Sequence, residues 1–134
     1  MKIVFDTNIW ISFAIGKRLS HLEQVLLNRR IKVFVSSELI LEFYHVASSS
    51  KLSKYLSEER IAETIQLIKA TTEVTSIHKA ASESRDSKDN YLLDLSRQIH
   101  ADYLVTGDKD LLVLKEYKGT TIISFSELLT KLKK

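Results

Sequence analysis

Short β-prone apolar runs alternate along this chain with segments whose apolar residues recur at helical spacing. This alternation is typical of a parallel sheet whose strands are joined by helices that cover both faces. The runs expected to form strands are KIVF at 2–5, IKVFVS at 31–36, TEVTSI at 72–77, YLVT at 103–106 and TTIISF at 120–125. The sequence therefore predicts an α/β fold, a three-layer sandwich with a mostly parallel central sheet flanked by helices.

Helical segments fill the intervals between these runs, and several of them begin at a serine that can cap a helix. The expected helices are one around 19–26, one capped by Ser36 or Ser37, one opened by Ser57 and ending near Ala70, one over 88–100, a short turn around 111–114, and a C-terminal helix after Ser124. Glu127 stands three residues after Ser124, which is the spacing of a capping box.

The 134 residues include no proline and only three glycines, so no flexible linker divides the chain and a single domain over 1–134 is expected. The absence of cysteine excludes disulfides and thiolate metal sites and is consistent with a cytoplasmic protein. The N-terminal MKIVFDTN has the pattern of neither a signal peptide nor a transmembrane segment, so no membrane association is expected. A net charge of +3 is compatible with nucleic-acid binding.

Four acidic residues stand where the connections of such a sheet diverge. Asp6 follows the first expected strand directly, and Asp108 follows the fourth. Glu42 lies about a turn and a half into the helix after the second strand, and Asp89 lies in the first turn of the helix that leads into the fourth. Because sites form outside the carboxyl ends of parallel strands, these four acids can meet at one edge of the sheet.

Carboxylates gathered in this way repel one another, and a divalent cation relieves that cost. Oxygen ligands of this kind are what magnesium or manganese prefers, and the bound ion can activate a water molecule for an in-line attack on a phosphodiester. The chain has no cysteine and no pair of histidines at ligand spacing, so zinc chemistry fits poorly. The pattern thus favours a hydrolytic nuclease that depends on Mg²⁺ or Mn²⁺.

Each acid also has a purely structural explanation. An aspartate after a strand is often a turn former or a helix N-cap, which would account for Asp6 taken alone. Asp110, two residues after Asp108, is a rival for the fourth position. Glu38, one turn earlier in the same helix, is a rival for Glu42. Asp86 and Asp89 bracket a helix start, so capping would explain either of them. The functional interpretation rests on the joint placement of the acids.

The chain resembles the PIN-domain nucleases in four successive segments. These are IVFDTNIW near the start, SELILEFYHV in the second expected helix, DSKDNYLLDLS before the fourth strand, and ADYLVTGDKDLL around that strand. The resemblance covers roughly residues 2–125 with the segments in order, and it is closest to the toxin components of bacterial toxin–antitoxin pairs. It implies a parallel sheet between helices, a magnesium or manganese ion and, as the usual substrate, single-stranded RNA.

Carried over by position, the resemblance implies that four acids are catalytic and hold the metal, namely Asp6, Glu42, Asp89 and Asp108. It also implies supporting roles for a second set of residues. In that set Asn8 would orient the site, Thr106 would stand beside the fourth acid, and Asp86 and Asp110 would be support residues or alternatives in register.

Partners follow from the same resemblance and from the distribution of basic residues. Five basic side chains close in sequence to the acids are candidates to hold RNA phosphates: Lys17, Arg18, Arg85, Lys88 and Lys109. For any one of them taken alone, a solvated surface is the better explanation. The resemblance further implies a homodimer and a small protein antitoxin as binding partner.

Other classes of function compete with the nuclease. A phosphoaspartyl receiver or phosphatase would need an acidic pair at the first strand end or a second aspartate two residues later, whereas Thr7 and Asn8 follow Asp6. An RNA-maturation nuclease and a non-catalytic PIN-like binding module are the alternatives within the fold. We therefore expect a metal-dependent endoribonuclease, the toxin of a toxin–antitoxin pair.

Overall fold

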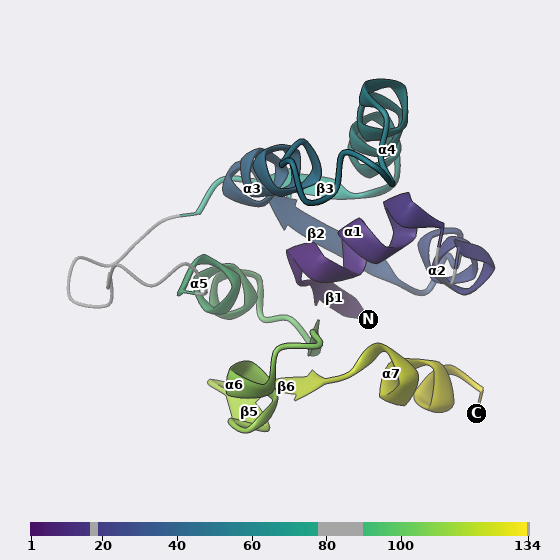
Figure 1. Ribbon diagram of the computed structural model, residues 1–134. Coiled ribbons are helices and arrows are strands. Elements are labelled where there is room, and N and C mark those ends of the chain that lie inside the picture. The colour runs from purple at the N-terminus through teal and green to yellow at the C-terminus, as the bar shows by residue number, and fades with distance from the viewer. Residues whose placement is uncertain (17–18, 78–89, 134) are drawn as a thin grey trace.

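Six strands form one sheet at the centre of the computed structural model, which describes residues 1–16, 19–77 and 90–133 (Figure 1). The strands are β1 (Lys2–Phe5), β2 (Lys32–Ser36), β3 (Glu73–Thr75), β4 (Tyr103–Val105), β5 (Glu116–Tyr117) and β6 (Thr120–Ile123). Their order in the sheet is β3-β2-β1-β4-β6-β5. The chain therefore builds outward from β1 to β3 on one side and then returns to add β4 on the other side of β1.

Every pair in the sheet is parallel except the last. Ile3 of β1 pairs with Val33 of β2 and with Tyr103 of β4, so β1 is a central strand with neighbours on both sides. The antiparallel β5 pairs with β6 at the edge of the sheet. This two-residue strand is absent from the sequence-based expectation, because two residues carry too little periodicity to reveal a strand.

Seven helices lie in the described ranges. They are α1 (Thr7–Ile15), α2 (Leu19–Leu26), α3 (Ser37–Ala47), α4 (Glu58–Thr71), α5 (Asn90–Ile99), α6 (Lys109–Leu112) and α7 (Phe125–Leu132). Contacts join α1 to α2, α3 and α4, while α5 packs on β1 and β4. In Figure 1 the helices α1 to α4 lie together in the upper half and α5 and α6 in the lower half. Right-handed connections running in opposite directions from β1 place helices on both faces of a parallel sheet, as the sequence predicts.

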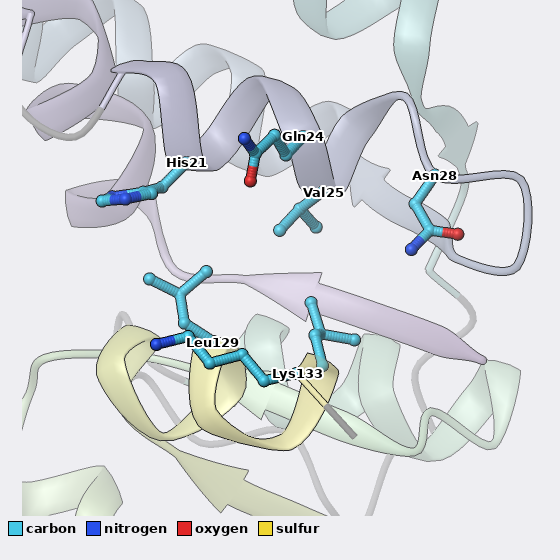
Figure 2. A pocket seen from close by; sticks show the side chains of 7 residues that line it. His21, Gln24, Val25, Asn28, Leu129 and Lys133 are labelled. Atoms are coloured by element: carbon cyan, nitrogen blue, oxygen red, sulfur yellow. The ribbon is translucent and has the colours of Figure 1, made fainter.

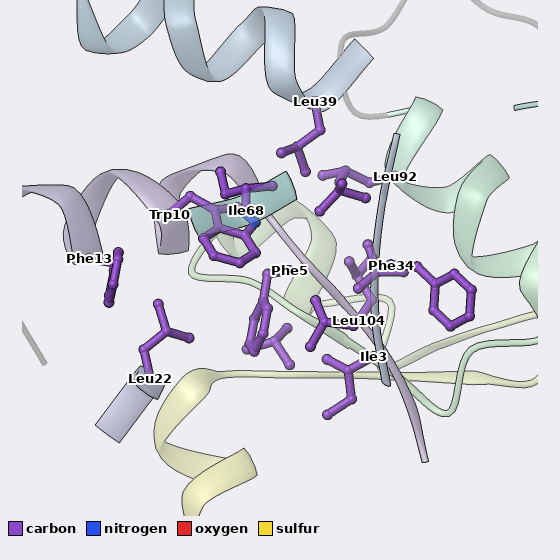
Figure 3. Packing of buried hydrophobic residues seen from close by; sticks show 14 of the residues in the cluster. Ile3, Phe5, Trp10, Phe13, Leu22, Phe34, Leu39, Ile68, Leu92 and Leu104 are labelled. Carbon is purple, nitrogen blue, oxygen red and sulfur yellow. The ribbon is translucent and has the colours of Figure 1, made fainter. Parts of the chain in front are cut away.

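The core is packed where the first strand meets the helices that follow it. Phe5 and Trp10 are both fully buried, and their rings meet edge to face with centroids 5.7 Å apart. The ring of Phe125, at the start of α7, also lies near Phe5, with 6.2 Å between ring centroids. Figure 3 shows Phe5 and Trp10 amid aliphatic side chains from several elements. Burying one such aromatic ring contributes about 2–3 kcal/mol, so this cluster fixes the position of the β1–α1 turn.

Local signals located the starts of α3, α4 and α7 correctly, whereas α1 was not among the expected helices, because its apolar residues show little helical periodicity. Ser36 and Ser57 are the N-caps of α3 and α4, each accepting a hydrogen bond from a backbone N–H. Ser124 and Glu127 form the reciprocal capping box before α7. The helix α6 begins at Lys109, two residues earlier than the turn expected at 111–114. In the described part of the chain, no helix has the length and apolar character needed to cross a membrane.

Candidate active site

Three of the four acids expected in the site, Asp6, Glu42 and Asp108, lie in the described part of the chain, on or next to elements around the central strands β1 and β4. β1 and β4 are neighbours in the sheet, although β2 and β3 come between them in the sequence. The order in which strands are added to the sheet therefore reverses between β1 and β4. Asp6 follows β1, and its backbone N–H donates to the carbonyl of Val105 at 2.9 Å. Thr106 follows β4 and donates through its backbone to Ile123 at 3.0 Å. In open α/β sheets, ligands bind outside the carboxyl ends of the strands at such a reversal.

Asp6 has a structural role and a position suited to chemistry at the same time. It is the N-cap of α1, because its Oδ1 accepts a hydrogen bond from the backbone N–H of Asn8 at 3.2 Å. Its Oδ2 accepts a second hydrogen bond, from the hydroxyl of Thr106 at 2.6 Å. The residue is only 6% exposed. With one oxygen capping a helix and the other held by a hydroxyl, the carboxylate has a fixed orientation.

Thr106 joins the first acid to the fourth. Its side chain is fully buried, and its hydroxyl donates to Asp6 while it accepts the backbone N–H of Asp108 at 3.0 Å. Asp108 is the N-cap of α6, with its Oδ1 accepting from the backbone N–H of Asp110 at 2.9 Å. Asp110 itself is exposed on α6. One hydroxyl thus couples the ends of β1 and β4.

Glu42 is held by the hydroxyl of Tyr91, which in turn contacts the hydroxyl of Thr7. It is half-buried on α3, and its Oε1 accepts a short hydrogen bond from the hydroxyl of Tyr91, which lies one residue into α5. The Tyr91 oxygen also stands 2.9 Å from the hydroxyl oxygen of Thr7, the first residue of α1. Thr7 is 2% exposed. Glu42 is therefore connected to the residue that directly follows Asp6.

Burial and two nearby carboxylates together determine the pKa of Tyr91. Burial raises the pKa of Tyr91 far above its ordinary value, and the hydrogen bond to Glu42 raises it further. The bond from Thr7 lowers this pKa, whereas the charges of Glu42 and Asp6 both raise it. Both carboxylates therefore act on one phenol, which remains a neutral hydrogen-bond donor at physiological pH.

Several predicted site residues lie outside the described ranges or make no side-chain contact with the acids. Outside the described residues are Asp86 and Asp89, together with the basic candidates Lys17, Arg18, Arg85 and Lys88. Asn8 is exposed, and its recorded contact with Asp6 uses the backbone N–H, which any residue except proline would offer. Lys109 is exposed at the start of α6. The rival Glu38 accepts a hydrogen bond from the hydroxyl of Ser37, its neighbour, at 3.2 Å.

Whether these residues suit a divalent ion can be judged from their donors and charges. In the described part of the chain, no three acidic or histidine side chains stand close enough together to hold a metal. The donor set nevertheless fits magnesium or manganese, because Asp6, Glu42 and Asp108 offer only carboxylate oxygens. Among the described residues, none of these three acids pairs with a lysine or arginine. Among the described residues, the three acids therefore suit a divalent cation through their oxygen donors and through their lack of a basic partner. Asp89 lies outside the described ranges.

Two residues that form hydrogen bonds in the candidate site were not predicted from the sequence. Tyr91 and Thr7 each stand next to or near a predicted acid, but a hydroxyl carries no sequence signal of its own. Tyr91 comes two residues after Asp89. Helical periodicity could have indicated Tyr91. Leu92, Leu95 and Ile99 define the buried face of this helix, and Tyr91 borders that face.

A hollow of about 460 Å³ lies elsewhere on the molecule, between α2 and α7 (Figure 2). Its lining residues are His21, Gln24, Val25, Asn28, Leu129, Leu132 and Lys133. Figure 2 shows His21 and Gln24 on one helix facing Leu129 on the other. None of the predicted catalytic acids contributes to this hollow, so it is separate from the candidate site.

Two solved structures share the fold of this chain. PAE2754 from Pyrobaculum aerophilum superposes with a TM-score of 0.70 at 15% identity, covering 99% of this chain and 90% of that one. VapBC2 from Rickettsia felis, bound to a DNA fragment from their promoter, gives a TM-score of 0.60 at 17% identity, covering 93% of this chain and 99% of that one. At such identities the likeness shows the fold alone. No curated protein matches the sequence.

The sequence itself matches the family model described as PIN domain over residues 2–110. This range begins at β1, ends within α6, and includes all four predicted acids. It confirms the resemblance seen in the sequence, and the PIN-domain family is a family of nucleases that generally use divalent metal ions. A sheet with this strand order, acids at the ends of β1 and β4, and a family match over most of the chain agree: the protein belongs to the PIN-domain family.

Proposed function

We propose that the protein is a metal-dependent endoribonuclease that hydrolyses phosphodiester bonds of single-stranded RNA. Asp6, Glu42, Asp89 and Asp108 would be its catalytic and metal-binding residues. The proposal combines membership of the PIN-domain family with the placement of three of these acids around the ends of β1 and β4.

One observation carries the proposal. Asp6 is 6% exposed and Glu42 is half-buried, and among the described residues both are held by neutral hydroxyls rather than by a cationic side chain. A carboxylate removed from water is costly unless a positive charge compensates it. A divalent cation supplies that compensation, and oxygen ligands suit Mg²⁺ or Mn²⁺.

The chemistry divides between the ion and the protein. When bound, the cation lowers the pKa of a coordinated water and polarises a phosphodiester oxygen. The residues of the chain hold the geometry: Thr106 fixes Asp6, and Asp108 is fixed by its place at the start of α6. In the proposed hydrolysis a water oxygen would bond to phosphorus while the bond to the leaving sugar oxygen breaks. The water would give up a proton and the leaving oxygen would take one up, without a covalent enzyme intermediate.

RNA is proposed as the substrate because of the family resemblance and the basic character of the chain, whose net charge is +3. Lys109 is exposed one residue after Asp108, so its ammonium can approach a phosphate next to the scissile bond. Lys17, Arg18, Arg85 and Lys88 are proposed as further phosphate contacts on the basis of sequence position alone.

We further propose that the protein is the toxin of a toxin–antitoxin pair, acts in the cytoplasm, and forms a homodimer. The structure of VapBC2, bound to a DNA fragment from their promoter, has the same fold, and this likeness supports a small protein antitoxin as partner. A groove of about 370 Å³ between α3 and α4 offers a surface of mixed character, lined by apolar residues such as Ile61 and Ile65 and by charged ones, Glu58 and Lys69. An RNA-maturation nuclease of the same fold is the alternative, and growth arrest on induction in a bacterial host separates the two.

The nuclease activity is tested with purified protein and one sequence prepared as single-stranded RNA, double-stranded RNA and single-stranded DNA, each end-labelled. We expect cleavage of the single-stranded RNA with Mn²⁺ or Mg²⁺ and none with a chelator. Asp6→Asn and Glu42→Gln should each reduce the rate at least about 100-fold, because the metal's share of transition-state stabilisation is several kcal/mol.

The matched control is Glu63→Gln, which removes an exposed carboxylate from α4 and should leave the rate within about two-fold. Urea unfolding of each variant shows whether the fold survives. Equal cleavage by wild type, Asp6→Asn and Glu42→Gln would show that the acids are not catalytic. A wild type that binds RNA without cutting it would favour the non-catalytic binding module instead.

A further inference from the structure

Tyr91 forms a bridge between three helices at the candidate site. Its hydroxyl contacts Glu42 on α3 and Thr7 on α1, while its own backbone belongs to α5. These helices are far apart in sequence, with Thr7 separated from Tyr91 by 84 positions. The side chain is half-buried, so the contact is partly shielded from water.

The direction of the hydrogen bonds follows from the chemistry of the groups. A phenol carries one proton, and an ionised carboxylate can only accept. The proton of Tyr91 therefore points to Oε1 of Glu42, and the hydroxyl of Thr7 donates in turn to the Tyr91 oxygen. Donation from Thr7 polarises the phenol and strengthens its bond to the carboxylate.

The same geometry leaves one oxygen of Glu42 available. Oε1 is occupied by Tyr91, whereas no hydrogen bond to Oε2 is recorded within the described ranges. A glutamate has three side-chain torsions, and a hydrogen bond to one of its oxygens restricts the rotation of its carboxylate. Second-sphere hydrogen bonds of this kind orient metal-binding carboxylates in proteins.

We propose that Tyr91, supported by Thr7, is a positioning residue that holds the Glu42 carboxylate with Oε1 occupied and Oε2 presented to the metal. The inference rests on the proposed function, since it takes Glu42 as a ligand. It goes further by assigning a role to two residues outside the acid set. A bridge that only braced α3 against α5 would affect the stability of the fold and leave the affinity for metal untouched.

The experiment measures Mn²⁺ binding to the full chain by isothermal titration calorimetry in the absence of RNA. Tyr91→Phe removes only the hydroxyl and should raise the Mn²⁺ dissociation constant roughly 10-fold or more, the range of second-sphere substitutions. The matched control is Tyr103→Phe, because Tyr103 is also half-buried but is the first residue of β4, at the end of the strand away from Thr106 and Asp108, and lies beside Lys131. That control should change the constant by less than about two-fold.

Thr7 provides a second, independent variant. Thr7→Val removes its hydroxyl at nearly constant volume and should weaken Mn²⁺ binding in the same direction, while Thr7→Ser restores the donor and the affinity. If Tyr91→Phe unfolds in urea too readily for titration, the Thr7 pair still tests the bridge.

A double-mutant cycle separates positioning from a direct role. In a Glu42→Gln background, Tyr91→Phe should add less than about two-fold to the loss of affinity, because its target has already been altered. Full additivity, or an unchanged constant in Tyr91→Phe when Glu42→Gln raises it, would overturn the inference and leave the proposed function intact. An unchanged constant in Glu42→Gln would instead remove Glu42 from the metal site, and the inference with it.

Discussion

The hydroxyl of Thr106 donates to Oδ2 of Asp6 at 2.6 Å across the junction between β1 and β4. The resemblance to PIN nucleases places Thr106 beside the fourth acid, and it does accept the backbone N–H of Asp108. Its closest side-chain partner, however, is the first acid. Thr106 thus couples two strand ends that are 100 residues apart in the chain.

Replacing this threonine should affect stability and activity together. Thr106→Val keeps the shape of the buried side chain but leaves Asp6 without its hydroxyl donor and Asp108 without an acceptor for its N–H. We expect a loss of about 1.5–3 kcal/mol in the free energy of unfolding, the value of a hydrogen bond to a charged group. Urea titration measures the loss, and Thr106→Ser should recover most of it.

The cleavage rate gives the second measurement on the same variants. It should fall roughly 10–100-fold in Thr106→Val, because the orientation of Asp6 is released. A valine variant as active and as stable as the wild type would show that the hydroxyl is dispensable.

The fourth acid can be identified by two substitutions two residues apart. Asparagine caps a helix about as well as aspartate, so Asp108→Asn should change the unfolding free energy by less than about 0.5 kcal/mol. Its cleavage rate should nevertheless fall at least about 100-fold, because a charged ligand is lost. Asp110 is exposed on α6 and offers its N–H to Asp108. Asp110→Asn should therefore reduce cleavage by a few-fold at most, and the reverse ranking would exchange the two assignments.

Alkaline conditions should destabilise the protein through Tyr91. Its pKa is raised above the ordinary 10.0 in the folded state, first by burial and then by the bond to Glu42. In the unfolded chain the phenol ionises as the pH passes 10, whereas in the fold it keeps its proton. The favourable contribution is therefore complete below pH 10 and is lost above it, by up to about 1.4 kcal/mol per pH unit.

The comparison of wild type with Tyr91→Phe isolates this contribution from the other tyrosines and the lysines. Unfolding free energies of both proteins, measured in urea from pH 8 to pH 11, should keep a constant difference up to about pH 10. Above that value the wild type should lose stability faster than the variant. Parallel curves over the whole range would mean that Tyr91 ionises as freely in the fold as in the unfolded chain.

Local patterns were sufficient to predict most of the architecture. The five longer strands and the capped starts of α3, α4 and α7 follow from period, β propensity and serine capping, all of which act within a few residues. The edge strand β5 was missed because it consists of Glu116 and Tyr117 alone and is defined by its pairing with β6. The same distinction between local and long-range causes separates the parts of the candidate site.

The sequence by itself determined the family, and it suggested the residue types of the candidate site. An aspartate after an apolar strand can be recognised without coordinates, and so can four segments in the order of a PIN domain, since both are properties of neighbouring residues. Only the tertiary structure decided which hydroxyl holds which acid. Thr106 meets Asp6, and Tyr91 meets Glu42, across 100 and 49 positions of sequence. Such contacts exist only after the sheet has brought the ends of β1 and β4 together and α3 and α5 have packed around them.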